Sequence, residues 1–255
     1  MSYFETGTSS VPFSEAMKDY SNISSNVRVH LAKVYSTLAL TCLTAAAGAY
    51  LHVNDMVIFG GGLLSFLVGL GSLIGILSLS PTPENNNVRF GLLWVFAFME
   101  GLSLGPLIKL AFAIDGSGEM VYFAALCTAG IFAAFTLSAL LCERRSYLYL
   151  GGLLGSVLNL LLWSQLFNMF FRSKLLWSIE LYTGLFMFCG YILYDTQAII
   201  YRAACGYTDV VGHTVDLFID LVGVFVRILV ILMQKEEDKK DRKRKEKRRN
   251  DYAAF

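Results

Sequence analysis

The chain has 255 residues, of which 55% are hydrophobic and 16% charged, and its mean hydropathy is +0.55. This apolar share is well above that of an ordinary soluble domain, and the formal net charge of +1 hides a strongly basic C-terminus. A soluble fold with charges scattered along amphipathic faces is therefore excluded.

Seven apolar runs are long enough, or nearly so, to cross a membrane, for which a helix needs about 20 residues. Backbone groups in lipid must be satisfied internally, so the runs are expected to be helices. Short turn-rich gaps make consecutive helices antiparallel neighbours. In chain order the expected helices are 32–53, 56–79, 88–114, 120–142, 147–171, 175–201 and 210–233.

These runs predict an all-α integral membrane protein, a compact bundle of six to seven transmembrane helices. The bundle occupies residues 31–233, between a polar N-terminal segment (1–30) and a basic tail (234–255). Segment 210–233 either spans the membrane or is re-entrant. The positive-inside rule places basic loops and tails on the cytoplasmic side. The basic loops and the basic tail can share that side only if this segment does not fully cross the membrane. Close helix packing is predicted at three GxxxG pairs, namely Gly71–Gly75, Gly101–Gly105 and Gly151–Gly155.

Neither a disulfide framework nor a zinc site is expected. The five cysteines are scattered and form no CxxC, and the three histidines stand far apart in the sequence. The cysteines are interpreted as small buried hydrophobic residues, and no cofactor is predicted.

Segment 210–233 carries a narrow polar stripe on an otherwise apolar helix. At 100° per residue its polar members fall within roughly 80° of one another. A central position in the bundle, with the stripe turned toward polar groups of a neighbour, is the simplest packing. Asp195 on the preceding helix is the best candidate for that neighbour, and Glu100 is another buried acid. The stripe consists of His213, Asp216, Asp220, Gly223 and Arg227.

Two carboxylates held close together at low dielectric cannot both be ionised at small cost, so Asp195 and Asp220 are expected to share a proton. The same oxygens are ligands for Ca²⁺, and a proton and a cation would compete for the pair. Arg227 is a possible latch on an ionised carboxylate. The alternative is that both aspartates are structural, bonded to Thr196, Gln197 or a backbone group.

These residues resemble the Bax inhibitor-1 (transmembrane Bax inhibitor motif) family. The resemblance runs from about residue 30 to residue 233 and rests on the order and spacing of five segments. They are HLAKVYSTLAL (30–40), MEGLSLGPLIK (99–109), ERRSYLYLGGLL (143–154), GYILYDTQAII (190–200) and HTVDLFIDLVGVFVRIL (213–229).

The resemblance implies a helical bundle of the endoplasmic reticulum membrane that suppresses cell death and leaks stored Ca²⁺ in a pH-dependent way. It assigns the proton-sensing pair to the D-T-Q aspartate, Asp195, and the L-F-x-D aspartate, Asp220, and it places the last helix centrally. Asp216 falls where the motif fixes nothing. Some prokaryotic relatives latch the pair with an arginine in the second helix, but segment 56–79 has no arginine, so another cation would have to take that role.

The basic run 239–249 is interpreted as a cytosolic tail that fixes orientation and touches anionic headgroups. The sharper alternative, which the resemblance also implies, is an arm that binds calmodulin. Apolar anchors for calmodulin would have to come from residues 228–233, which the membrane also occupies. Nucleic acid is not an expected partner, because no aromatic residues interleave the basic ones. The tail cations concerned are Lys243, Arg244, Lys245, Lys247, Arg248 and Arg249.

Two other functions are alternatives to the Ca²⁺ leak. A non-conducting scaffold that binds cell-death regulators or lipid-modifying enzymes is compatible with the same residues. An intramembrane aspartyl protease would also place two aspartates on adjacent helices. That class requires a P-A-L turn after its second aspartate, and the last proline of this chain is Pro106. The chain is therefore predicted not to be an enzyme.

Overall fold

The computed structural model describes residues 24–57, 61–141 and 150–253, and every regular element within them is a helix. The expected all-α fold is confirmed. The helices in chain order are α2 (Ser25–Val53), α3 (Leu63–Ser78), α4 (Asn86–Asp115), α5 (Glu119–Leu141), α6 (Leu150–Phe171), α7 (Lys174–Ala204) and α8 (Val210–Ala253).

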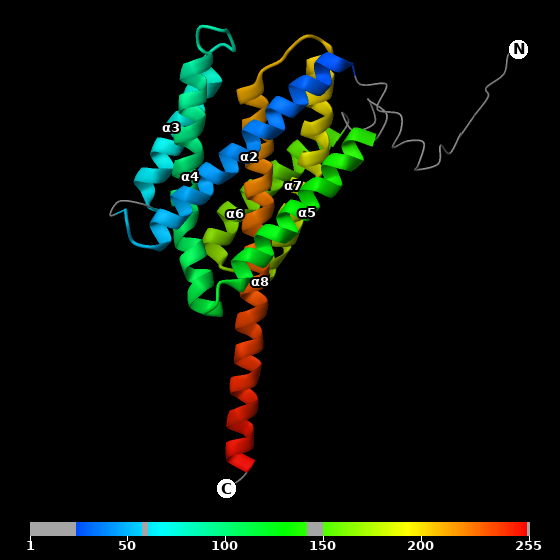
Figure 1. Cartoon of the computed structure of the whole chain (residues 1–255). Helices are drawn as coiled ribbons and strands as arrows, with labels where there is room; N and C mark the ends of the chain where they lie inside the picture. Colours follow the sequence, from blue (N-terminus) through cyan, green and yellow to red (C-terminus); the bar gives the residue numbers. More distant parts are fainter. Residues whose placement is uncertain (1–23, 58–60, 142–149, 254–255) are drawn as a thin grey trace, which may run out of the picture.

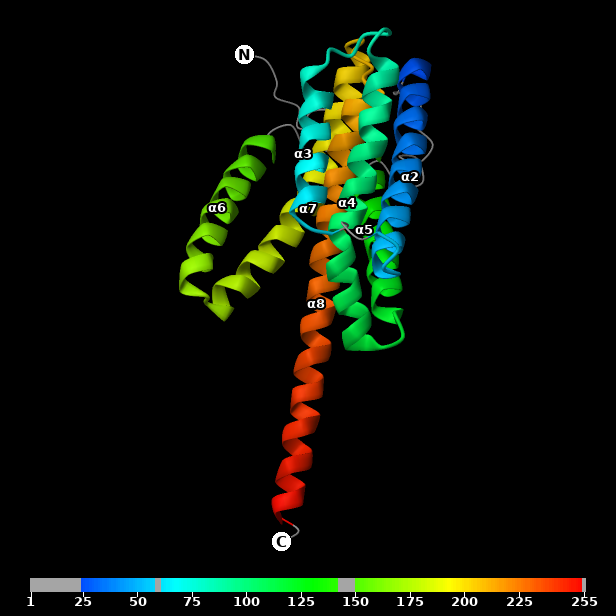
Figure 2. The ribbon, with the colours of Figure 1, turned by 90° about the vertical axis from the view of Figure 1, so that its left-hand side faces the viewer.

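Successive helices alternate in direction through the bundle (Figures 1 and 2). The start of α2, the α3–α4 turn and the α7–α8 loop lie together at one end, which we call the loop end. The α4–α5 and α6–α7 turns lie toward the other end, where α8 leaves the bundle, and we call this the tail end.

Within the part of the chain that the structure describes, five helices are identified as long and apolar enough to cross a membrane: α2, α4, α5, α6 and α7. Helix α3 is apolar but has 16 residues, so it is about 24 Å long and falls short of the hydrocarbon thickness. The predicted span 56–79 is therefore too long. The cause is local: Gly61 has φ 79°, a left-handed conformation, and Gly62 is the N-cap of α3.

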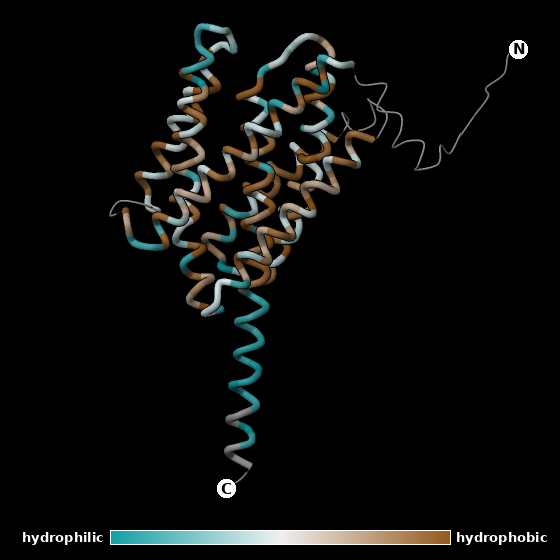
Figure 3. The backbone as a smooth tube through the Cα atoms, viewed as in Figure 1, coloured by the Kyte–Doolittle hydropathy of each residue, from teal (hydrophilic) through white to brown (hydrophobic). Residues whose placement is uncertain are grey.

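Helix α8 is unbroken from Val210 to Ala253 and does not turn back. It joins the predicted seventh segment and the tail in one helix of 44 residues, and the end of that helix projects from the bundle (Figures 1 and 3). At the other end of the chain, α2 begins at Ser25, so residues 25–30 of the predicted polar segment are helical, with Val27 buried. Residues 1–23 and the 142–149 connection, with its arginines, lie outside the described residues.

The expected central position of the last helix is confirmed. Helix α8 packs against α2, α3, α4, α5 and α7. Val211 and Phe218 of α8 belong to a core cluster shared with α2, α4 and α7, and Val224 and Leu229 belong to a second cluster toward the tail end. Helix α6 packs mainly on α7 and leaves apolar side chains such as Phe170 exposed, as expected for a surface that faces lipid.

The GxxxG pairs differ in what they contact. Gly101 and Gly105 of α4 lie directly against Ala45 and His52 of α2, which confirms close packing there. In the other two pairs one glycine faces a side chain and its partner, Gly71 or Gly155, has nothing within 4 Å. The GxxxG motif therefore predicted close packing of both glycines correctly at one of the three pairs.

Candidate functional site

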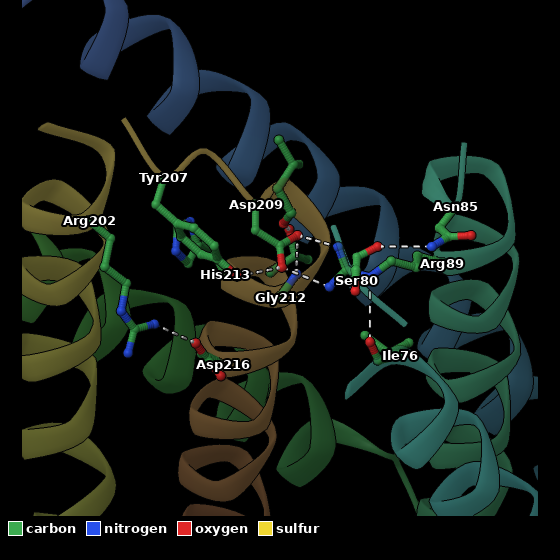
Figure 4. A network of polar contacts seen from close by, with 12 residues as sticks. Ile76, Ser80, Asn85, Arg89, Arg202, Tyr207, Asp209, Gly212, His213 and Asp216 are labelled. Carbon is green, nitrogen blue, oxygen red and sulfur yellow. Dashed lines mark hydrogen bonds and ion pairs between the residues drawn. The ribbon is translucent and has the colours of Figure 1, made fainter. Parts of the chain in front are cut away.

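The polar stripe of α8 is divided among several neighbours, because its members face different helices in turn. Proceeding from the loop end, His213 meets α2, Asp216 meets the end of α7, and Asp220 meets the middle of α7. Asp209, the residue directly before α8, meets α4. Figure 4 shows the loop-end part of this series. Polar contacts thus join the central helix, or the residue just before it, to α2, α4 and α7.

Asp195 and Asp220 are brought together as predicted. Their carboxyl groups lie within hydrogen-bonding distance of each other, and a hydrogen bond between two carboxyls requires a proton on one of them. Asp220 is 3% exposed, and within the described residues its Oδ2 atom has no hydrogen-bond donor. The pair therefore consists of two neighbouring carboxyl groups with one unpartnered oxygen, held in the low-dielectric centre of the bundle.

The two polar neighbours of Asp195 in the sequence do not bond to it. The side-chain nitrogen of Gln197 donates to the carbonyl of Ala139 on α5, and Gln197 and Thr196 are both fully buried. The hydrogen bonds of the described residues thus give no support to the structural alternative, in which Thr196 or Gln197 would satisfy the aspartate.

Asp216 and Arg202 lie at the edge of the site. Arg202 Nη1 is 3.7 Å from Asp216 Oδ2, and the two side chains are 45% and 40% exposed (Figure 4). Asp216 precedes Asp220 by one helical turn, so it lies on the same face of α8, toward the loop end. This ion pair is far more exposed than the buried pair.

Arg227 does not act as a latch on the aspartate pair. Its guanidinium lies over the ring of Phe188, 4.4 Å from the centroid, and its Nη1 donates to the carbonyl of Gly223 at 3.1 Å. The prediction failed because Arg227 follows Asp220 by two turns, which puts its head group within reach of an aromatic face on α7 instead. Arg227, Phe188 and Glu100 line one cavity of about 350 Å³, which lies between α3, α4, α7 and α8.

Arg89 and Asp209 form a buried bidentate ion pair that sequence reasoning missed. Arg89 Nη1 and Nη2 each donate to a carboxylate oxygen of Asp209 at 2.7 Å, and the residues are 4% and 8% exposed (Figure 4). Asp209 also accepts from the Gly212 N–H at 3.0 Å, as an N-cap of α8. Burial alone would raise the pKa of Asp209, but the hydrogen bonds from Arg89 and Gly212 outweigh it and hold the pKa below its usual value.

A signal for Asp209 was present in the sequence, since an aspartate directly before the first residue of an apolar helical run is an N-cap pattern. Its partner on α4 was not predictable, because no local pattern links residues 120 positions apart. The same holds for His30 of α2, whose Nε2 lies 2.9 Å from Nδ1 of His213, with both rings buried.

The tail cations lie on the exposed part of α8. Lys243, Arg244, Lys245 and Arg249 are exposed; the side chains of Lys247 and Arg248 lie outside the described residues. The apolar residues required as calmodulin anchors are buried in the bundle: Ile228, Leu229 and Met233 are 8%, 0% and 7% exposed. A calmodulin-like partner would have to withdraw them from the core.

Across the described parts of the chain, no group of three or more His, Cys, Asp or Glu side chains converges on a metal position. The Asp195–Asp220 pair offers carboxylate oxygens only, whereas Ca²⁺ takes six to eight oxygen ligands. Water and backbone carbonyls would have to complete the coordination, which suits an ion in transit better than a tightly held one.

Together, the apolar bundle and the aspartate pair at its centre define a multi-pass helical membrane protein built around a buried ionisable site. Residues 27–237 match the family model described as "Inhibitor of apoptosis-promoting Bax1". The chain is 45% identical to Bax inhibitor 1 of Homo sapiens and of Bos taurus, in each case over 88% of this chain, covering 93% and 94% of the relatives. It is 42% identical to Bax inhibitor 1 of Arabidopsis thaliana over 93% of this chain and 94% of that relative. The chain belongs to the Bax inhibitor 1 family.

Proposed function

We propose that this chain suppresses programmed cell death from the endoplasmic reticulum membrane by acting as a pH-sensitive leak pathway for Ca²⁺. The names of its relatives support the anti-apoptotic part, and the aspartate pair supports the leak. Asp195 and Asp220 serve as proton sensor and as ion-pathway groups, and the basic tail faces the cytosol.

The observation that carries the proposal is the unpartnered oxygen of Asp220 beside a second carboxyl group. A pair that shares one proton holds its hydrogen bond and carries a single negative charge. Loss of the proton leaves two like charges in a low-dielectric site, and a divalent cation is the partner that relieves them. Proton and Ca²⁺ therefore compete, so raising Ca²⁺ is expected to move the midpoint of the pH response to lower pH.

Replacing Asp195 or Asp220 with asparagine tests the leak. Asparagine keeps the shape but neither titrates nor supplies charge, so each variant is expected to lose the pH dependence of flux. The rate should fall about tenfold or more, the equivalent of one lost interaction with a charged group at roughly 1.5–3 kcal/mol. The measurement is Ca²⁺ flux from proteoliposomes over a pH series, with Asp238→Asn on the tail as the matched control. Flux that both substitutions leave unchanged at every pH would overturn the proposal.

A scaffold that conducts nothing is the second candidate, and the part of α8 that projects from the bundle favours it. That helix presents exposed Lys and Arg side chains to partners, well clear of the apolar bundle (Figure 3). Wild-type protein that gives no flux at any pH, and still captures cell-death regulators through residues 235–253, would support the scaffold and exclude the leak.

A further inference from the structure

His30 and His213 join the start of α2 to the central helix near the loop end. Their ring nitrogens lie 2.9 Å apart, the ring centroids are 5.1 Å apart, and the interplanar angle is 78°. The two residues are 4% and 1% exposed, and His213 Nε2 has no hydrogen-bond partner within the described residues. A backbone contact follows one turn along, where the Thr214 hydroxyl approaches the carbonyl of Val34 at 3.5 Å. The histidine contact is thus the main polar link between α2 and α8 at this end.

The contact works only with a limited number of protons. One of the two facing nitrogens must carry a hydrogen and the other must offer a lone pair. Two neutral imidazoles satisfy this condition when their tautomers are complementary, and so does one imidazolium beside a neutral ring whose facing nitrogen carries the lone pair. When both rings are protonated, two N–H groups face each other with no acceptor between them, and two positive charges repel at contact distance. The second proton therefore breaks the bond.

Charged groups on every neighbouring element act on this pair. Asp209 of the loop favours the protonated rings, whereas Lys33 of α2 and Arg202 of α7 oppose them. Arg89 of α4 neutralises Asp209 through the bidentate pair, so the acid is not free to bond a histidine. Tyr207 packs edge-on against His213, with ring centroids 5.8 Å apart, and closes the site toward the loop. The surroundings thus supply only one compensating anion, which already has a partner.

We propose that His30 and His213 form an acid-sensitive latch that holds α2 on the central helix and releases it when both rings are protonated. Release frees the loop end of α2 from α8. Asp220 lies two turns further along α8, so the latch positions the helix that carries the aspartate pair. The effect of the latch on Ca²⁺ flux rests on the proposed function, but the latch itself does not.

The three histidines of the chain make a direct test feasible. Full-length protein with ¹⁵N-labelled histidine rings is placed in nanodiscs and followed by NMR from about pH 8 to about pH 3, a range extended below that of ordinary histidines because both rings are buried. A nitrogen–nitrogen coupling across the hydrogen bond is expected at neutral pH between two of the three residues. It should be lost in acid as both rings become doubly protonated. A coupling that is absent at neutral pH, or that persists at about pH 3, would overturn the latch.

Variants then separate the latch from the leak. In His30→Gln the amide can still bond His213 but cannot be protonated, so His213 should gain its second proton without repulsion and at higher pH than in wild type. His52→Gln on the same helix is the control and should leave His213 unchanged. Flux that loses only its acid component in His30→Gln links the latch to the leak. If wild type shows no flux, the NMR result still decides the latch, so failure of the latch and failure of the leak are distinguishable.

Discussion

Replacing Arg89 with methionine is expected to destabilise the bundle by about 3–5 kcal/mol, the range found when one partner of a buried ion pair is removed. The side chain lost is of similar length, so packing changes little, but Asp209 is left buried without a cationic partner and keeps only the Gly212 N–H at 3.0 Å and the Tyr207 hydroxyl at 3.5 Å among the described residues. Thermal or SDS-induced unfolding of the purified protein measures the effect. The matched control is Lys109→Met, which breaks an exposed pair with Asp55 and should have little measurable effect.

A second substitution checks the cause. Adding Asp209→Asn to Arg89→Met removes the uncompensated charge and keeps an N-cap oxygen, so the double variant should recover part of the lost stability. If the double variant is as unstable as the sum of the two single variants, the pair is not coupled in the way the geometry indicates.

The pH dependence follows with a definite sign. In wild type the pKa of Asp209 is held below its usual value, so the stabilisation is present above the unfolded-state pKa and is lost only as pH falls through the lower folded-state value. In Arg89→Met, burial is left to raise the pKa of Asp209, so that variant loses stability as pH rises. The difference in stability between wild type and Arg89→Met should therefore shrink on acidification from pH ~7 to pH ~5, which unfolding curves at the two values would show.

The helical fold and its central helix were predictable because both depend on composition and periodicity within one segment. The polar stripe of α8 had no low-energy place except the middle of the bundle, and Asp195 was the nearest buried acid along the chain. The length of α3 was not predictable from hydropathy. Gly61 and Gly62 are apolar enough to belong to the hydrophobic run, but the helix begins only after them.

The partner of each residue in the polar stripe could not be predicted from the sequence, for a different reason. Which side chain meets His213 or Asp209 depends on the rotation and crossing of α2 and α4 against α8, and one residue of helix rotation changes the partner by 100°. Arg227 shows the same limit: the stripe placed it correctly on one face, but that face meets Phe188 at this depth and not a carboxylate.

A second substitution with a large expected effect on stability lies at Gly101, where α2 and α4 cross. A Cβ atom built there would lie 2.7 Å from the carbonyl carbon of Ala45 and 2.9 Å from its Cα, and closer still to its oxygen. These are backbone atoms, so no rotamer change relieves the contact, and the helices would have to move apart. Gly48 of α2 faces α4 in the same way, with the carbonyl of Phe98 against it, so the two helices approach along their backbones.

Gly101→Ala is therefore expected to destabilise the protein by about 1–3 kcal/mol and Gly101→Val by more, as overpacking does in a well-packed interior. Gly91→Ala is the matched control, because Gly91 lies on the same helix with nothing within 4 Å of its added Cβ. There alanine should be neutral or stabilising by up to about 1 kcal/mol, from helix propensity alone. Thermal unfolding of the three variants beside wild type decides the matter. Equal effects of alanine at 91 and 101 would mean that α2 and α4 do not cross at Gly101, and the placement of His30 and Arg89 around α8 would then have to be revised as well, because α2 and α4 carry them there.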